Sequence, residues 1–120
     1  MSDHKSITLS HNLRLWVMRF LIMKMAPRES LLLSSYIQEY VLRTKEPKKG
    51  RWDTLSIPEL IDLMSEEMDE LKEAYEDFRR DPTLDNGTHV FTEVADVQNY
   101  GMMIQDNMMG NPHGTRGADK

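Results

Sequence analysis

Two short clusters of acidic residues carry the clearest chemistry in this sequence. The first reads EEMDE over residues 66–70, and the second reads EVAD over residues 93–96. Each contains two acids three positions apart, so on a helix each pair lies along one side, one turn apart. Two such pairs facing each other would form a cage of four carboxylates, which repel one another unless a divalent cation lies between them. The clusters therefore predict a metal site.

The composition narrows the choice of metal and of partner. The chain has no cysteine, which excludes disulfides and thiolate sites and leaves oxygen or imidazole as metal ligands. These ligands favour Mg²⁺ or Mn²⁺ before zinc. The net charge of −5 argues against a protein whose main role is to coat nucleic acid.

Hydropathy favours a cytoplasmic protein with no membrane segment. The most apolar run covers residues 13–25, and Arg14, Arg19 and Lys24 interrupt it. No stretch reaches the ~18 uncharged apolar residues of a spanning helix. The run also lacks the small-residue cleavage pattern of a signal peptide.

Apolar residues recur at helical spacing in four segments, which predicts an all-α, four-helix domain over residues 1–109. The expected helices cover about residues 10–25, 30–44, 56–80 and 88–109. We expect a loose N-terminus over residues 1–8, a loop from Lys45 to Trp52, and a disordered tail over residues 110–120. The chain shows no internal repeat and no second domain.

The third helix has the best-defined start. Ser56 is its N-cap, Pro58 lies in the first turn, and Glu59 stands three residues after the cap, which is a capping-box arrangement. Thr88 is the expected cap of the fourth helix, after the turn-forming sequence DNG at residues 85–87.

At about 100° per residue, the helical projection separates the acids by position. Glu67 and Glu93 fall inside the apolar stripes of their helices, and Glu70 and Asp96 fall on the same edge. Glu66 projects from nearly the opposite side of its helix. Acids on a solvated helix surface are the simpler interpretation of either pair alone, but an unpartnered carboxylate on a packing face is costly. Two matched pairs favour the metal site.

Other residues have both a structural and a functional interpretation. Tyr100 and His89 fall on the acidic side of the fourth helix, although His89 also suits helix capping. Asn99 lies off the apolar face, so its role depends on another chain or a loop. Trp52 is either a core anchor or an aromatic ring that stacks on a base. The basic run, which contains Lys45, Lys48, Lys49 and Arg51, is either a solvated loop or a phosphate-binding segment.

The order of these motifs resembles that of the MazG-like all-α nucleotide pyrophosphohydrolases. The resemblance covers about residues 48–109 and includes KGRW at 49–52, EEMDEL at 66–71 and ADVQNYGMM at 95–103. The last string is most similar to the small stand-alone members found in bacteria and their phages. The resemblance implies a four-helix fold and a homodimer or homotetramer with its site between helices. Residues 1–45 resemble the family less distinctively.

The resemblance also implies a reaction and roles for particular residues. The reaction is hydrolysis of a nucleoside triphosphate between its α and β phosphates with Mg²⁺ or Mn²⁺, and we expect a purine deoxynucleotide such as dGTP or dATP. The metal ligands are Glu67, Glu70, Glu93 and Asp96. The acceptor of the water proton is Glu66 or Glu67, and the motifs do not decide between them. We further expect these substrate-binding residues: Lys49 and Arg51, or Lys72, at the phosphates, Trp52 at the base, and Asn99 and Tyr100 on the fourth helix.

Two other functions fit a helical protein with many acids. A ferritin-like di-metal oxidoreductase needs Glu-x-x-His motifs, and neither acidic cluster has a histidine at that place. A non-catalytic interaction module would use the acids as a partner-binding face. Glu67 and Glu93 inside the apolar stripes argue against this module.

Overall fold

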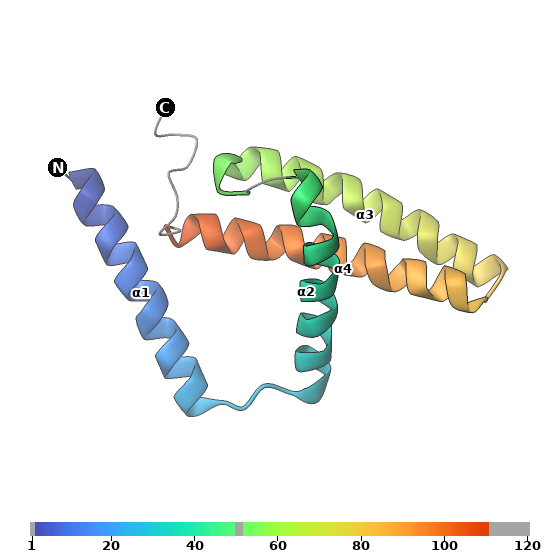
Figure 1. Cartoon of the computed structure of the whole chain (residues 1–120), viewed down its shortest axis with the longest axis horizontal. Helices are drawn as coiled ribbons and strands as arrows, with labels where there is room; N and C mark the ends of the chain where they lie inside the picture. The colour runs from blue at the N-terminus through green and yellow to red at the C-terminus, as the bar shows by residue number, and fades with distance from the viewer. Residues whose placement is uncertain (1, 50–51, 111–120) are drawn as a thin grey trace.

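The computed structural model describes the backbone of residues 2–49 and 52–110, and the side chains of residues 12–45 and 52–110. Over these residues the chain is helical and has no strand, which confirms the all-α class. The elements are α1 (Ser2–Lys24), α2 (Glu29–Lys49), the short 3-10 helix η1 (Trp52–Thr54), α3 (Ile57–Arg80) and α4 (Leu84–Met108). Helices α3 and α4 lie side by side, α2 crosses α4, and α1 stands apart (Figure 1). The expected tail from residue 111 onward lies outside the described residues.

The start of α3 is as the sequence predicts. The Ser56 hydroxyl accepts a hydrogen bond from the Glu59 backbone N–H at 3.2 Å, and the Glu59 carboxylate accepts one from the Ser56 N–H at 2.8 Å. This capping box fixes the first turn and hence the register of the acids further along the helix. The helix ends at Arg80, before an Asp-Pro sequence, as predicted.

Helix α4 begins earlier than predicted, because Thr83 rather than Thr88 is its N-cap. The Thr83 hydroxyl accepts a hydrogen bond from the Asn86 N–H at 3.1 Å. The turn predicted around Gly87 is therefore helical. A Cβ atom at Gly87 would lie 3.3 Å from the Phe78 ring, so the missing side chain lets α4 start close to the end of α3. The predicted end of α4, at about residue 109, agrees with the structure.

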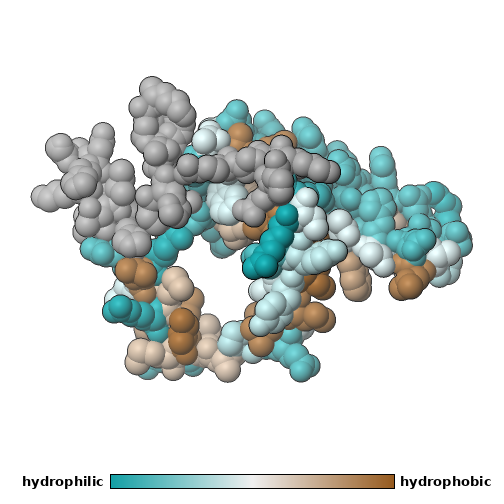
Figure 2. Space-filling model, viewed as in Figure 1, coloured by the Kyte–Doolittle hydropathy of each residue, from teal (hydrophilic) through white to brown (hydrophobic). Residues whose placement is uncertain are grey.

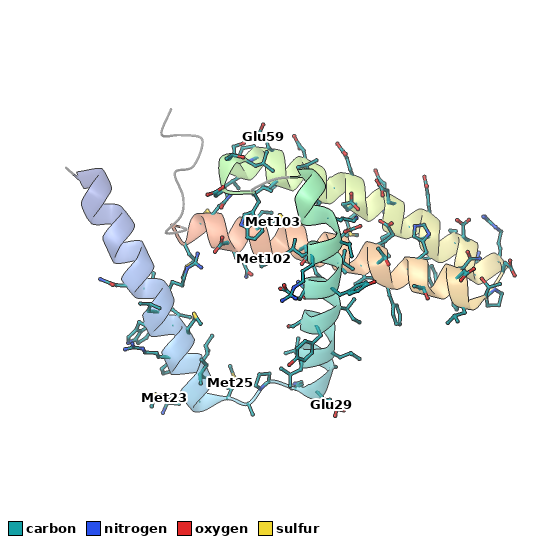
Figure 3. All side chains as sticks on the ribbon, in the orientation of Figure 1. Met23, Met25, Glu29, Glu59, Met102 and Met103 are labelled. Atoms are coloured by element: carbon teal, nitrogen blue, oxygen red, sulfur yellow. The ribbon has the colours of Figure 1, made fainter. Side chains whose placement is uncertain are left out.

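The core lies between α3 and α4 and under the crossing of α2. Leu60, Ala74 and Ala95 are fully buried there, and Val41 of α2 is buried as well. Alanine at helix contacts lets the two backbones come close together, because nothing larger separates them. This close approach allows short side chains on the facing sides of α3 and α4 to meet. Met102 and Met103 lie along α4 beneath the start of α3 (Figure 3).

Helix α2 is longer than predicted. It continues to Lys49 rather than ending near Thr44, so the first part of the predicted loop is helical. The Lys45 ammonium group donates a hydrogen bond to Asp96 of α4 at 2.6 Å, which holds this turn of α2 against α4. The sequence pattern missed this turn because its stabilising contact comes from a distant helix.

Helix α1 begins at Ser2 rather than near Ser10, since residues 2–9 contain no proline or glycine that would interrupt the helix. Among the described residues it does not pack along another helix, but its Arg14 guanidinium forms an ion pair with Asp106 of α4. Hydrophobic side chains are exposed along α1 and the adjoining part of α2, and open space separates the two helices (Figure 2). Within the described part of the chain, no helix combines the length and apolar character that a bilayer crossing requires.

Candidate metal centre

Three carboxylates meet where α3 and α4 pack together. Glu67 comes from α3, and Glu93 and Asp96 come from successive turns of α4. Each offers one oxygen atom, and the three oxygens lie within 4.8 Å of one another. Ala95, next to Asp96 in sequence, is fully buried, so the helix surfaces beside the acids are in close contact. The structure therefore brings together three of the four predicted ligands, from both motifs.

The acids from α4 are buried, and the hydrogen bonding of Glu93 is incomplete. Glu93 is 7% exposed and Asp96 is 5% exposed. The Oε1 atoms of Glu93 and Glu67 are both buried and have no hydrogen-bond partner. A buried carboxylate oxygen without a partner has lost its water at a cost, and native proteins rarely leave such atoms unsatisfied. A cation among these oxygens would supply the missing interaction.

Two basic side chains approach the outer oxygens of the centre. The Lys45 Nζ atom lies 2.6 Å from Asp96 Oδ2, and the His89 Nε2 atom lies 3.1 Å from Glu93 Oε2. Burial lowers the pKa of Lys45, but the hydrogen bond to Asp96 and the nearby negative charges outweigh burial and raise it overall. The lysine thus stays charged and neutralises part of the acidic cluster.

The acidity of Glu67 is strongly perturbed. Burial, followed by the charges of Asp96, Glu70 and Glu93, raises the pKa of Glu67 from 4.5 to about 7, although Lys45 opposes the shift. Negative groups crowded together in this way favour the protonated carboxyl. A divalent cation would reverse that preference, because metal ligands bind in the deprotonated form.

The remaining motif acids lie at the margin of the centre. Glu70 is exposed and does not belong to the group of three, but its charge contributes to the raised pKa of Glu67. Glu66 is exposed on α3, as expected for an acid that projects from the other side of the helix. Both therefore remain close in sequence to the centre without adding an oxygen to it.

Two of the predicted substrate residues hold the fold together. The Asn99 side chain is buried and bonded twice to Gln38 of α2, accepting from its Nε2 at 3.3 Å and donating to its carbonyl oxygen at 3.2 Å. The Trp52 indole N–H donates to Asp106 at 3.0 Å, and the Asn107 amide donates to the Trp52 carbonyl at 3.1 Å. Their predicted contacts with substrate stay predictions.

The other predicted substrate residues are scattered. Tyr100 is buried on α4, four residues after Asp96. Lys72 is exposed on α3 and lines a surface hollow with Glu73, Glu76, Asp77 and Arg80. The side chain of Lys49 and the whole of Arg51 lie outside the described residues. The carboxylate centre therefore has one described basic residue from α2 beside it, which is Lys45.

Lys45 is the residue that the sequence did not single out. It belongs to a basic run whose simplest interpretation is a solvated loop, and 51 residues separate it from Asp96. No spacing rule connects the two positions. The one signal in the sequence is the position of Lys45 at the end of an apolar helix. One further helical turn there brings the Lys45 side chain to α4.

The donor set suits Mg²⁺ or Mn²⁺. Carboxylate oxygens are the ligands these ions prefer, and Mg²⁺ is usually held by a few carboxylates together with water and substrate phosphates. Three oxygens from Glu67, Glu93 and Asp96, two of them on carboxylates with an unsatisfied Oε1 atom, fit this description. His89 adds an imidazole at the edge through its contact with Glu93.

The chain matches no family model, no curated protein and no solved structure. The geometry of the three carboxylates is therefore the basis for a function, together with the order of the acidic motifs in the sequence.

Proposed function

We propose that this protein is a metal-dependent nucleoside triphosphate pyrophosphohydrolase. The observation that carries the proposal is the group formed by Glu67, Glu93 and Asp96. One carboxylate oxygen from each lies within 4.8 Å of the other two, and the Oε1 atoms of Glu67 and Glu93 are buried without a hydrogen-bond partner. The ion is Mg²⁺ or Mn²⁺, and the likeness of the motif order to the MazG-like enzymes supplies the reaction.

The reaction adds water at the α-phosphorus. The bond between this phosphorus and the oxygen that bridges to the β-phosphorus breaks, and pyrophosphate leaves with that oxygen. When bound, the metal neutralises phosphate charge and lowers the pKa of the attacking water. Asp96 and Glu93 hold their carboxylates fixed on one side of α4, so the ligands are in place before substrate binds. We expect Glu70, one turn beyond Glu67, to complete the ligand set.

A carboxylate of α3 accepts the proton from the attacking water. Glu67 lies within the group of three oxygens and carries a buried Oε1 atom without a partner, whereas Glu66 is exposed. A general base must lie within hydrogen-bond reach of the proton that it removes. This requirement favours Glu67 over Glu66.

The negative charge of the three carboxylates favours a triphosphate substrate that binds together with a metal ion. A bare triphosphate would be repelled by three clustered carboxylates, whereas a metal ion between acids and phosphates attracts both. Our preferred substrate is a purine deoxynucleoside triphosphate such as dGTP or dATP, and the expected role is control of the cytoplasmic nucleotide pool.

We propose that the working molecule is a homodimer or homotetramer. Large hydrophobic side chains are exposed along α1 and α2, including Trp16, Phe20, Leu32 and Leu33. Apolar patches of this extent are typical of protein interfaces. Residues 12–28 of α1 and the following loop carry four basic and no acidic residues, whereas α3 is rich in acids. The α1 helix of one copy therefore complements α3 of another in charge.

The direct test is product analysis with purified protein. The protein is incubated with Mg²⁺ or Mn²⁺ and a panel of ribo- and deoxynucleoside triphosphates, and pyrophosphate and orthophosphate are measured separately. We expect equal amounts of nucleoside monophosphate and pyrophosphate. Orthophosphate without pyrophosphate would contradict cleavage between the α and β phosphates, and no turnover with any nucleotide would favour an interaction module.

A further inference from the structure

The carboxylate centre has a positive group of its own, supplied by a third helix. Lys45 of α2 places its ammonium nitrogen 2.6 Å from Asp96 Oδ2, and the charges of Glu67 and Glu93 also act on it. The Asp96 side chain is 7% exposed, whereas that of Lys45 is 36% exposed. The lysine thus reaches from solvent to a buried metal-ligand candidate.

The position of Lys45 conflicts with a metal ion bound among the same carboxylates. A cation on Asp96 would approach an ammonium group that is already bonded to that carboxylate, and like charges at such short range repel strongly. Three crowded acids without any cation would also repel one another. If only one positive group binds at a time, the ammonium group and the metal do not repel each other, and the acids are still partly neutralised. The ammonium group and the metal therefore compete for Asp96.

We propose that Lys45 is a phosphate-binding residue that neutralises Asp96 until the metal arrives and then binds the triphosphate. This inference rests on the proposed function and adds a residue to it. The lysine side chain is flexible, and its ammonium group carries three hydrogen-bond donors on a compact charge. The ammonium group can therefore exchange one oxygen acceptor for another. Its partial exposure gives it room to turn away from Asp96 without unfolding α2.

The chemistry of the substrate supports this transfer. A triphosphate bound through a metal still carries negative oxygens that the metal does not touch, and a nearby cation stabilises the charge that develops on them during the reaction. Lys45 is the described cation in direct contact with the carboxylate centre, apart from His89, which contacts Glu93 and carries a charge only when protonated. The Lys45 ammonium group would therefore approach the phosphates from the α2 side.

A purely structural ion pair makes different predictions. If Lys45 only held α2 against α4, its loss would lower stability and would leave the affinity for the triphosphate unchanged. Competition predicts tighter metal binding, because removing the ammonium group removes a competitor for Asp96. It also predicts a loss of affinity for the triphosphate, so the two effects have opposite signs.

The experiment compares the full-length wild type with Lys45→Met and with Lys45→Gln. The glutamine keeps a side-chain hydrogen-bond donor on the Asp96 side of α2 without the charge. Arg43→Met is the matched control, since it removes an exposed cation from the same helix. Binding of Mn²⁺ alone is measured by titration calorimetry, and binding of α,β-methylene-dGTP, which resists cleavage, is measured in saturating Mn²⁺.

We expect both Lys45 variants to bind Mn²⁺ about tenfold more tightly than wild type, equivalent to about 1.4 kcal/mol. We expect them to bind the nucleotide analogue about tenfold more weakly, with wild-type values for Arg43→Met. Unchanged or weaker Mn²⁺ binding in Lys45→Gln would overturn the proposal, and so would an unchanged affinity for the analogue. A wild type that binds no Mn²⁺ would overturn the proposed function as well, which separates the two failures.

Discussion

Glu67 lies in an unfavourable electrostatic environment, crowded by other acids. It is only partly exposed, its Oε1 atom has no partner, and the acids of α4 face it. Its carboxyl therefore has two favourable states, protonated in the absence of metal or ionised beside a cation. A structural role alone gives no reason to keep an acid in this environment, since a neutral side chain would pack there at lower cost.

The first prediction concerns the pH dependence of stability without metal. The pKa of Glu67 is about 7 in the fold, above its ordinary value of 4.5, because of burial and the charges of Asp96, Glu70 and Glu93. The folded state thus binds this proton more tightly than the unfolded state does, and stability is lost as the pH rises through the folded pKa. We expect the thermal midpoint of chelator-treated protein to fall between about pH 5 and about pH 8.

The contribution of Glu67 is isolated by substitution. Thermal unfolding of Glu67→Gln, which has no carboxyl to titrate, should show a smaller fall over the same pH range than wild type. Glu73→Gln, an exposed acid of α3, is the control and should retain the wild-type slope. Equal slopes in wild type and Glu67→Gln would contradict the raised pKa.

The second prediction concerns Asp96 and catalysis. Asp96→Asn keeps the shape of the side chain but removes the charge that a metal needs, so we expect turnover to fall by about 10²-fold or more. Far-UV circular dichroism should show unchanged helix content. Asp69→Asn, an exposed aspartate on α3, should retain activity. Full activity in Asp96→Asn would remove this residue from the centre.

At the scale of the elements, the centre depends on how α2, α3 and α4 cross. The capping box at Ser56 could be predicted because its two hydrogen bonds join residues three apart in sequence. The start of α4 could not, because both Thr83 and Thr88 suit a cap, and the room that Gly87 leaves for the Phe78 ring favours the first. Likewise, Lys45 reaches Asp96 only through the crossing of α2 over α4, which no local pattern encodes.

The sequence identified the acids of the centre for a related physical reason. Periodicity places Glu67 and Glu93 on packing faces, and two packing faces must meet somewhere in a helical protein. Periodicity could not show that Asn99 forms hydrogen bonds with Gln38, because hydrogen bonding between helices depends on their crossing angle and register. The position of Glu70, outside the group of three, likewise follows from the side-chain geometry rather than the spacing.

The third prediction tests the role of Asn99. Its buried amide exchanges two hydrogen bonds with Gln38, so Asn99→Ala removes two partly buried hydrogen bonds between α4 and α2. We expect the free energy of unfolding, measured in urea, to fall by about 1–3 kcal/mol. Gln98→Ala also breaks a link to α2, through Ser34, but at an exposed site, and should cost less. A fully stable Asn99→Ala with weakened nucleotide binding would instead assign this residue to the substrate.

In the molecule as a whole, helix α1 leaves large apolar side chains exposed. Within the described residues it packs along no other helix, and Trp16 stacks on Phe20 at 5.5 Å on an exposed surface. Met23 and Met25 at its end are exposed as well (Figure 3). A helix with this surface gains stability mainly by burying it against another surface. A second copy offers exposed apolar residues on α2 and acids on α3.

The fourth prediction is therefore an oligomer held together through α1. Light scattering after size-exclusion chromatography should give at least the mass of a dimer for wild type. Phe20→Glu places a charge in the exposed apolar row and should shift the protein toward monomer, because burying an unpaired charge is costly. Thr88→Glu adds the same charge at an exposed position of α4, outside the proposed interface, and is the control. A monomeric wild type would contradict the proposed assembly.

The proposed function depends above all on whether a divalent cation binds between α3 and α4. Mn²⁺ binding is measured by electron paramagnetic resonance for wild type, Glu67→Gln, Glu93→Gln and Asp96→Asn, with Glu73→Gln as the control. Wild type and control should bind Mn²⁺ equally, and each of the other three should lose more than about tenfold in affinity. Equal affinity in all five proteins would show that the three carboxylates are not the metal site.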